Sequence, residues 1–430
     1  MTGRESRIAV VGTGYVGLTT GACLAALGHH VTCSDVDRCK IGLLSRGEVP
    51  LREPDLPRLV RRGLARGRLR FTVDTRDAVD GAGVVFLCLP TPMASGGEAD
   101  LAAVREVVAD VRASLPGGCA LVTKSTVPVG TAARLKELVG RPDVALVSNP
   151  EFLREGSAVR DFLHPDRVVV GSADRAAADR VAALYAPLHA PVVRTDAASA
   201  ELVKYAANAF LAAKLSYVNA VAELCEAEGA DIGAVTAALG RDPGVGRSFL
   251  RPGPGWGGSC LPKDTRALLR AAEAAGTGFP VLRAAIEANR RQQRRVVDRV
   301  AEACGGALRG HRVGLLGLAF KAGTDDLRDS PALAVAAGLA ARGADVVACD
   351  PALRGDERGI GESVAFVDDA YRAAKGARAL VLLTEWPQFR ELDWCRVAEL
   401  LEGAVVVDTR NHLDPDVLRR AGLVRRGIGC

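Results

Sequence analysis

The sequence predicts an α/β protein with two doubly wound, Rossmann-like domains joined by a long central helix. Residues 7–35 contain a strand, a glycine-rich turn, a helix and a second strand, which is the opening unit of a doubly wound sheet. Residues 311–411 contain a second series of apolar strands alternating with helical segments. Between the two series, residues 197–230 have no proline, and no glycine before Gly229, which predicts one long helix.

The first element is a short apolar strand, residues 8–11, followed by a G-x-G-x-x-G turn. Gly12 permits the tight turn, Gly14 lets a pyrophosphate approach the backbone, and Gly17 allows close packing of helix and strand. The N-terminus of the following helix offers free N–H groups to phosphates. The pattern alone is a weak signal, because a purely structural turn can carry the same glycines.

The second strand strengthens the dinucleotide prediction, because it ends in an acidic residue, Asp35, 18 residues after Gly17. This carboxylate would bind the ribose hydroxyls and repel a 2′-phosphate, so we expect NAD rather than NADP. Lys40 lies five residues further on and could reach the pyrophosphate.

Polar residues follow the next three predicted strands of the sheet. The strand at 84–89 precedes Thr91, the next precedes Thr126, and the third precedes Glu151 and Glu155. In doubly wound sheets, ligands bind beyond the carboxyl ends of the strands. Each residue alone could be an ordinary loop residue, but together they favour a ligand site.

The long helix at 197–230 is apolar nearly all round, as expected for a helix buried between domains or subunits. We therefore expect a homodimer formed through this helix. Lys204 and Asn208 are four residues apart and share a face. They are candidate site residues, although a salt bridge and a structural amide would explain them equally well.

The next element is a glycine- and proline-rich loop at 251–260 that ends in Cys260 and leads into a helix with Pro262 in its first turn. A helix N-terminus and the neighbouring Lys263 both stabilise a thiolate and lower the pKa of the thiol. Asp264 lies one helical turn further on, about 6 Å along the axis. We therefore expect a reactive thiol. The alternative is a tight loop with an incidental cysteine.

The last third of the chain predicts a second doubly wound domain whose first loop is GLAFKAGTDDLRDSP instead of G-x-G-x-x-G. Lys321 and Arg328 in this loop are candidate phosphate ligands, and Arg410 follows the last strand at the ligand-binding edge. Two nucleotide-type domains with a thiol between them suggest two nucleotides, of which one is NAD and the other a phosphate-bearing substrate.

Composition is that of a globular protein of two or three domains, with 430 residues, 48% of them hydrophobic and 25% charged. The net charge of +5 permits binding of small anions but does not indicate nucleic-acid binding. We find no signal peptide and no apolar run of about 18 residues, so we expect a cytoplasmic protein that does not bind membranes. The eleven cysteines include no Cys-x-x-Cys pair, so neither a metal site nor a disulfide framework is expected.

Several motifs resemble those of the UDP-glucose/GDP-mannose dehydrogenase family. They are GTGYVG, LPTP, KSTVPVGT, NPEFLREG, KYAANAFLAAKLSYVN, PGPGWGGSCLPKD and GLAFKAGTDDLRDSP, and they run in order from residue 7 to about residue 412. The resemblance implies a four-electron oxidation of a nucleotide sugar at carbon 6, through an aldehyde to a carboxylate, with reduction of two NAD⁺. It also implies that Cys260 is the nucleophile, forming a thiohemiacetal and then a thioester.

The resemblance also assigns roles to the other candidate residues. Catalytic residues besides Cys260 would be Lys204, Asp264, Asn208, Glu151, Glu155 and Thr126. Residues that bind NAD would be Gly12, Gly14, Tyr15, Val16, Gly17, Asp35, Lys40, Thr91, Thr126, Glu155 and Arg328. Residues that bind the nucleotide sugar would be Glu151, Phe152, Leu153, Lys204, Asn208, Phe249, Gly257, Cys260, Phe320, Lys321 and Arg410.

The chain departs from the family pattern at three positions, of which one, Ala220 in place of a frequent glutamate after Asn219, has no consequence that we can argue. Gly244 stands where the family often has an arginine that crosses to the neighbouring subunit's substrate, and Arg247 and Arg251 are the candidate replacements. Trp256 stands where tyrosine or phenylalanine is usual and should keep the stacking surface. The preferred substrate is UDP-glucose, with dTDP-glucose and GDP-mannose as alternatives.

We predict three domains: an NAD-binding domain at 1–196, a central helical domain with the cysteine loop and the dimer interface at 197–300, and a nucleotide-sugar-binding domain at 301–430. Two other functions compete with this prediction. A two-electron hydroxy-acid dehydrogenase would use Lys204 but would need neither the Cys260 loop nor the third domain. A catalytically silent nucleotide-binding module would need none of the catalytic residues.

Overall fold

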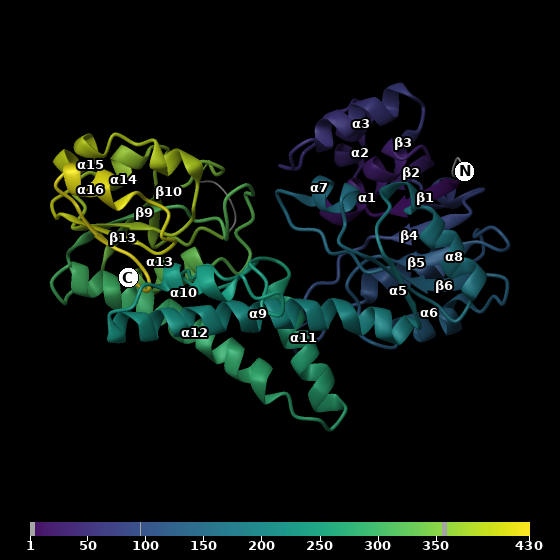
Figure 1. Cartoon of the computed structure of the whole chain (residues 1–430). Coiled ribbons are helices and arrows are strands. Elements are labelled where there is room, and N and C mark those ends of the chain that lie inside the picture. The colour runs from purple at the N-terminus through teal and green to yellow at the C-terminus, as the bar shows by residue number, and fades with distance from the viewer. Residues whose placement is uncertain (1–4, 95, 355–358) are drawn as a thin grey trace. The chain divides into compact units, whose positions relative to one another are not determined.

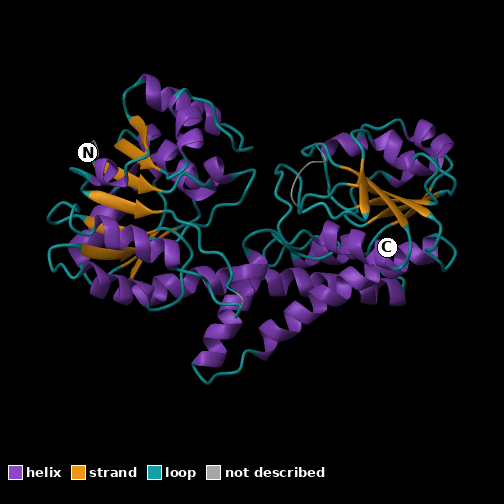
Figure 2. Cartoon of the chain, turned by 180° about the vertical axis from the view of Figure 1, so that it is seen from behind, coloured by secondary structure: helices purple, strands orange, loops and turns teal. Residues whose placement is uncertain are grey.

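The computed structural model describes residues 5–94, 96–354 and 359–430, and it divides the chain into two compact units. The first unit consists of residues up to 207 together with 266–271, and the second consists of 208–265 and 272–430. Each unit contains one sheet with helices packed against it (Figures 1 and 2). The predicted fold class, α/β with two Rossmann-like domains and a long central helix, is confirmed.

The sheet of the first unit has the strand order β3-β2-β1-β4-β5-β6-β7-β8. Its strands are β1 (Arg7–Val11), β2 (His30–Ser34), β3 (Leu69–Thr72), β4 (Val84–Leu87), β5 (Ala120–Thr123), β6 (Ala145–Ser148), β7 (Val168–Gly171) and β8 (Val192–Thr195). The first six strands are parallel and have the dinucleotide-binding order. β7 joins β6 through a single antiparallel pair, Ser148 and Gly171.

Helices cover this sheet because successive side chains of its strands are apolar on both faces. In β1, Ile8 and Val10 belong to one buried cluster, and Ala9 and Val11 belong to another. The helices of the unit are α1 (Tyr15–Ala26), α2 (Arg38–Ser45), α3 (Leu56–Ala65), α4 (Thr75–Val79), α5 (Ala102–Val111), α6 (Thr131–Val139), α7 (Ala158–Leu163), α8 (Arg175–Ala183) and the 3₁₀ turn η1 (Ala186–Leu188).

The sheet of the second unit has the order β11-β10-β9-β12-β13-β14 and is parallel throughout. Its strands are β9 (Arg312–Leu316), β10 (Asp345–Cys349), β11 (Val364–Phe366), β12 (Ala379–Leu382), β13 (Val405–Asp408) and β14 (Val424–Arg426). The remaining helices are α10 (Ile232–Leu239), α11 (Leu261–Ala274), α12 (Pro280–Ala303), α13 (Pro331–Ala341), α14 (Ala370–Ala374), η2 (Pro387–Arg390), α15 (Trp394–Leu400) and α16 (Pro415–Arg420).

The predicted central helix is α9 (Ala197–Glu228), a single helix of 32 residues. It ends just before Gly229, whose φ of +70° favours glycine and is typical of a helix end. Within the residues described above, none of the helices has both the length and the apolar character that a membrane span requires.

Candidate active site

The glycine turn between β1 and α1 has the geometry of a dinucleotide site. Gly12 has φ +95°, and a side chain on Gly17 would collide with the carbonyl group of Gly12. Space is open around Gly14, with nothing within 4 Å of where a Cβ would lie. Tyr15 and Val16 form the first turn of α1 directly after this opening. A phosphate can therefore approach the N-terminal N–H groups of α1, and the turn fits NAD.

Asp35, at the end of β2, is held in its ionised form. Thr13 donates to it from the backbone N–H (2.9 Å) and from the hydroxyl (2.7 Å), and Lys40 lies 3.0 Å away. Burial opposes ionisation of this carboxyl, but the hydrogen bonds from Thr13, Asp37 and Lys40 outweigh burial and lower its pKa to about 2. An ionised acceptor at this position fits the ribose of NAD. In this structure Lys40 forms an ion pair with Asp35.

The loops after β4 and β5 come together at neighbouring strand ends. The Thr91 hydroxyl donates to the Thr126 carbonyl (2.9 Å), and the Ser125 hydroxyl donates to the Leu89 carbonyl (2.6 Å). These bonds fix both loops at the carboxyl edge of the sheet, where a ligand of this fold lies.

Lys204 and Glu151 form a buried ion pair in the first unit. Lys204 Nζ lies 3.0 Å from Glu151 Oε1, and the two side chains are only 4% and 6% exposed. The other Glu151 oxygen accepts the backbone N–H of Leu153 (2.6 Å), and Lys204 Nζ also lies 5.5 Å from the centre of the Phe152 ring. This arrangement brings together four predicted residues and keeps a cation beside a carboxylate in a dry environment. Glu155 lies further along the same loop, between β6 and α7.

Cys260 lies immediately before α11 in the second unit and is partly buried, with its Sγ 3.6 Å from the Ser259 hydroxyl. One turn into the helix, Asp264 is buried at 1% exposure. Its carboxylate accepts hydrogen bonds from the Asn208 amide (2.6 Å) and from Lys263 Nζ (2.6 Å). The predicted thiol, carboxylate and amide therefore lie on neighbouring segments of one unit.

The cysteine loop packs directly on the loop that follows β9. A Cβ on Gly257 would collide with the carbonyl of Asp329, and one on Gly258 would lie 2.8 Å from the Phe320 ring. Lys321 Nζ lies 5.4 Å from the centre of that ring. Only glycine fits at 257, because backbone occupies the place of a side chain.

Arg410 joins this group from the end of β13. Its guanidinium donates to the carbonyls of Leu383 (2.9 Å) and Phe320 (3.1 Å) and lies 3.1 Å from Glu385. Burial would raise the pKa of Glu385, but the Arg410 charge and two backbone hydrogen bonds together outweigh burial and hold that pKa below its usual value. A side chain on Gly253 would meet the same guanidinium at 3.1 Å, so Arg410 also lies against the cysteine loop.

Trp256 anchors the cysteine loop. The indole is buried and donates to the Ser216 hydroxyl (2.9 Å), and the Trp256 backbone exchanges two hydrogen bonds with the Asn289 amide (2.7 and 2.9 Å). We expected this residue to keep a stacking surface; in the structure its ring is buried and is hydrogen-bonded to Ser216 of α9.

The other predicted residues of the second unit lie nearer the surface. Arg328 is exposed and pairs with Asp326 (2.7 Å), and Phe249 has φ +61° in the loop before Trp256. Gly244, Arg247 and Arg251 are exposed in the same loop region. The predicted site residues thus fall into two groups, one in each unit.

Lys124 and Glu53 are two of the buried charged residues of the first unit that were not predicted from the sequence. Lys124, directly after β5, donates to the Asn149 amide oxygen (3.0 Å) and the Tyr185 hydroxyl (3.2 Å). Glu53 is buried in the loop between α2 and α3. The available signal for Lys124 is a lysine directly after an apolar strand, inside the KSTVPVGT motif.

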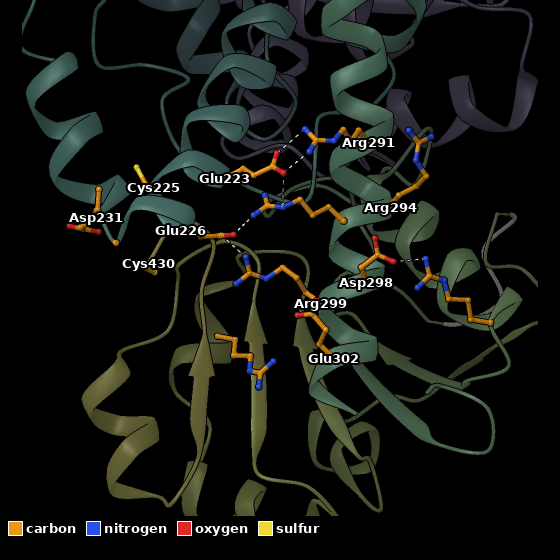
Figure 3. Close-up of a pocket in the computed structure, with 15 residues that line it drawn as sticks. Glu223, Cys225, Glu226, Asp231, Arg291, Arg294, Asp298, Arg299, Glu302 and Cys430 are labelled. Carbon is orange, nitrogen blue, oxygen red and sulfur yellow. Dashed lines mark hydrogen bonds and ion pairs between the residues drawn. The ribbon is translucent and has the colours of Figure 1, made fainter. Parts of the chain in front are cut away.

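A groove of about 930 Å³ in the second unit lies elsewhere, between α9, α12 and the C-terminal segment (Figure 3). Arginines of α12 point toward acids of α9, with Arg291 paired to Glu223 (2.5 Å) and Arg299 paired to Glu226. Glu226 also accepts the backbone N–H of Gly429 (2.7 Å). None of the predicted site residues lines this groove, and its paired charges join three segments of the unit.

Three family models match the chain in order. They are the NAD-binding domain (residues 6–189), the central domain (198–291) and the UDP-binding domain (314–415) of the UDP-glucose/GDP-mannose dehydrogenase family. The chain belongs to the UDP-glucose/GDP-mannose dehydrogenase family. The resemblance described from the motifs is therefore confirmed.

Relatives within this family match the chain over nearly its full length. UDP-glucose 6-dehydrogenase TuaD of Bacillus subtilis is 42% identical over 429 residues, which cover 98% of this chain and 93% of the relative. UDP-glucose 6-dehydrogenase of Rhizobium meliloti is 42% identical over 433 residues, covering 98% and 99%. The structure of a UDP-glucose dehydrogenase from Pyrobaculum islandicum superposes with a TM-score of 0.88 at 38% identity, covering 95% of each chain.

Family membership gives the protein its reaction class. It is an NAD-dependent nucleotide-sugar dehydrogenase, with NAD as cofactor and a nucleotide sugar as substrate. The predicted enzyme class and cofactor are confirmed, and neither a hydroxy-acid dehydrogenase nor a silent module describes the chain.

Proposed function

We propose that this protein oxidises carbon 6 of UDP-glucose to a carboxylate, giving UDP-glucuronate, in two steps that pass through a thioester on Cys260. The observation that carries the proposal is the position of Cys260 at the N-terminus of α11, one turn before the buried Asp264. The curated relatives at 42% identity support UDP-glucose as the sugar nucleotide. The alternatives are dTDP-glucose, since the methyl group that distinguishes thymine from uracil changes binding by only about 1–3 kcal/mol, and GDP-mannose.

NAD, when bound at the glycine turn and Asp35, supplies the hydride acceptor for both oxidations. In the first, a carboxylate base takes the proton of the 6-hydroxyl as carbon 6 loses hydride and becomes an aldehyde. The Cys260 thiolate then adds to the aldehyde carbon, forming a C–S bond and a thiohemiacetal oxyanion. The second loss of hydride converts this adduct to a thioester. Water attacks the thioester, the C–S bond breaks, and the carboxylate product leaves with the thiolate restored.

The buried charges have defined roles in this scheme. Lys204 is a positioned cation that stabilises negative charge on the reacting oxygen, and Asn208 donates to the same oxygen. Asp264 orients water or accepts its proton. Glu151, Glu155 and Thr126 complete the acid–base set, with Glu151 also holding Lys204 at 3.0 Å.

The remaining proposed roles concern binding. The nucleotide sugar is held by Glu151, Phe152, Leu153, Lys204, Asn208, Phe249, Gly257, Cys260, Phe320, Lys321 and Arg410. NAD is held by Gly12, Gly14, Tyr15, Val16, Gly17, Asp35, Lys40, Thr91, Thr126, Glu155 and Arg328. We propose three domains: an NAD-binding domain at 1–196, a central helical domain with the cysteine loop and the dimer interface at 197–300, and a nucleotide-sugar-binding domain at 301–430.

A homodimer and a cytoplasmic location complete the proposal. Phe210, Tyr217 and Leu224 are spaced by seven residues along α9 and are 67%, 60% and 59% exposed. Large apolar side chains at this spacing form a stripe along one helix face that a second copy would cover. All eleven cysteines are free, which supports a reducing compartment.

The thioester can be tested by quenching the reaction in acid during turnover of UDP-glucose and measuring the intact mass. We expect a sugar-nucleotide adduct on the wild-type protein that maps to Cys260, and none on Cys260→Ala, whose kcat should fall at least about a thousandfold. Cys39→Ala, which removes an exposed thiol, is the matched control and should keep both adduct and activity. Turnover retained by Cys260→Ala would contradict the proposal.

A further inference from the structure

Glu53 is a buried carboxylate with no role in the mechanism above. It lies in the loop between α2 and α3, only 4% exposed. Burial raises the pKa of Glu53, and backbone N–H donors lower it in part. A carboxylate is costly to bury unless donors surround it, so its partners show what the residue holds in place.

The partners of Glu53 come from two distant segments of the first unit. One oxygen accepts the Tyr15 hydroxyl and the backbone N–H of Gly156 (2.8 Å). The other oxygen accepts the backbone N–H of Val159 (3.2 Å). The Gly156 N–H also reaches the Tyr15 oxygen (2.6 Å), so the three groups form a closed triangle.

The triangle joins two parts of the candidate site. Tyr15 is the first residue of α1, directly after Gly14 of the dinucleotide turn. Gly156 directly follows Glu155, in the loop that also carries Glu151. This loop leads into α7, which lies beside α1 (Figure 1).

We propose that Glu53 is a positioning residue that fixes the loop at residues 151–157 to the start of α1, and so holds Glu151 and Glu155 in register with the bound dinucleotide. The inference rests on the proposed roles of these two glutamates. A misplacement of about 1 Å in such a loop can cost up to about a hundredfold in rate.

The alternative to a positioning role is a purely structural one, in which Glu53 only caps α7. The hydrogen-bond geometry distinguishes the positioning role from the capping role. The bond from Val159 to Glu53 is enough to cap α7, whereas the bonds through Tyr15 connect the loop to α1. Tyr15→Phe therefore removes the link to α1 and leaves the cap. Glu53→Gln is nearly isosteric, but it turns an NH₂ group toward donors and disrupts both.

The experiment compares Tyr15→Phe, Glu53→Gln and the double variant with wild type and with Glu48→Gln, an exposed acid in the same loop. With saturating NAD⁺ and UDP-glucose, we expect each single variant to lower kcat about tenfold, while the KM for NAD⁺ changes less than about threefold. The double variant should be no slower than the slower single variant, because both substitutions break one network. Glu48→Gln should match wild type.

Hydrogen exchange in the protein without substrate gives a readout that does not depend on activity. We expect faster exchange of the Gly156 amide in Tyr15→Phe with the Val159 amide unchanged, and faster exchange of both in Glu53→Gln. Three results would overturn the inference. They are an unchanged exchange rate of the Gly156 amide, a kcat within about twofold of wild type in folded single variants, and a double variant whose loss of kcat is the product of the two single losses. Absence of NADH from UDP-glucose in wild type and Glu48→Gln alike would instead contradict the proposed function.

Discussion

At the scale of single residues, Lys124 shows what burial does to a charge whose hydrogen-bond partners are neutral. Its ammonium donates to an amide and a hydroxyl and lies over the rings of Tyr185 and Phe162, 5.4 and 5.9 Å from their centres. Burial is the largest influence, and it outweighs the opposing effects of Cys88 and the Glu151 charge and lowers the lysine pKa to about 8. The folded protein therefore releases a proton more readily than the unfolded chain, whose lysine has the ordinary value of 10.5.

This shift predicts a pH dependence of stability. Between about pH 8 and about pH 10 the unfolded state binds more protons at this group, so Lys124 makes the free energy of unfolding rise with pH. Lys124→Met should remove that contribution, which urea unfolding at about pH 7 and about pH 9.5 would measure. Lys136→Met, an exposed lysine on α6, should keep the wild-type difference between the two pH values. An unaltered difference in Lys124→Met would refute the prediction.

A residue can be recognised from the sequence when its contacts lie close to it along the chain. Asp35 is recognisable because its spacing from Gly17 is fixed by one strand–turn–helix–strand unit. Glu53 is not, because its partners Tyr15 and Gly156 are 38 and 103 residues away. Its burial is created by tertiary packing, which no local pattern encodes.

At the scale of elements, both sheets have the same glycine turn after their first strand, β1 or β9, but the aspartate beside each turn has different partners. Gly12 donates to Ser34 and Gly317 donates to Cys349, both at 2.8 Å, and both glycines have φ near +95°. An aspartate follows each second strand.

The two aspartates then differ. Asp35 accepts from Thr13 and Lys40 and is partly exposed. Asp350 is buried, and one of its oxygens accepts three donors: the backbone N–H groups of Leu318 (2.8 Å) and Ala319 (3.0 Å) and the Trp386 indole (3.2 Å). The second sheet therefore keeps the turn but uses its acid internally, which agrees with a family model that separates an NAD-binding from a UDP-binding domain.

The exposed stripe of α9 carries the prediction about assembly. Phe210→Glu places a charge in the middle of the proposed dimer contact, so we expect a shift from dimer to monomer in sedimentation equilibrium. Val193→Glu introduces the same charge at an exposed apolar position on β8 and should leave the mass unchanged. A Phe210→Glu protein that stays dimeric would rule out this face as the interface.

At the scale of the whole molecule, the long helix and most strands were predictable, whereas strands such as β3, β7 and β8 and the connections between elements were not. The strand–helix alternation and the limits of α9 follow from local apolar patterns, and the predicted helix ending near 230 is observed to end at Glu228. The helix α9 has 32 residues and is about 48 Å long. The boundary between the two units falls within it, between residues 207 and 208. The three domain boundaries proposed from the sequence therefore remain predictions.

The candidate site followed the same rule. Residues of local motifs, such as Cys260 and Asp264, could be proposed from the sequence because they lie within one turn of helix. Pairs that join distant segments, such as Lys204 with Glu151 or Arg410 with Glu385, emerged only from the packed structure.

The central claim is a four-electron oxidation, and the most direct test is the number of NADH molecules formed per sugar. Limiting UDP-glucose would be consumed completely in excess NAD⁺ and the absorbance of NADH recorded. Two NADH for each UDP-glucose are expected, because the thioester step makes the second oxidation follow the first on the same enzyme. One NADH per sugar, with an aldehyde as product, would contradict the account.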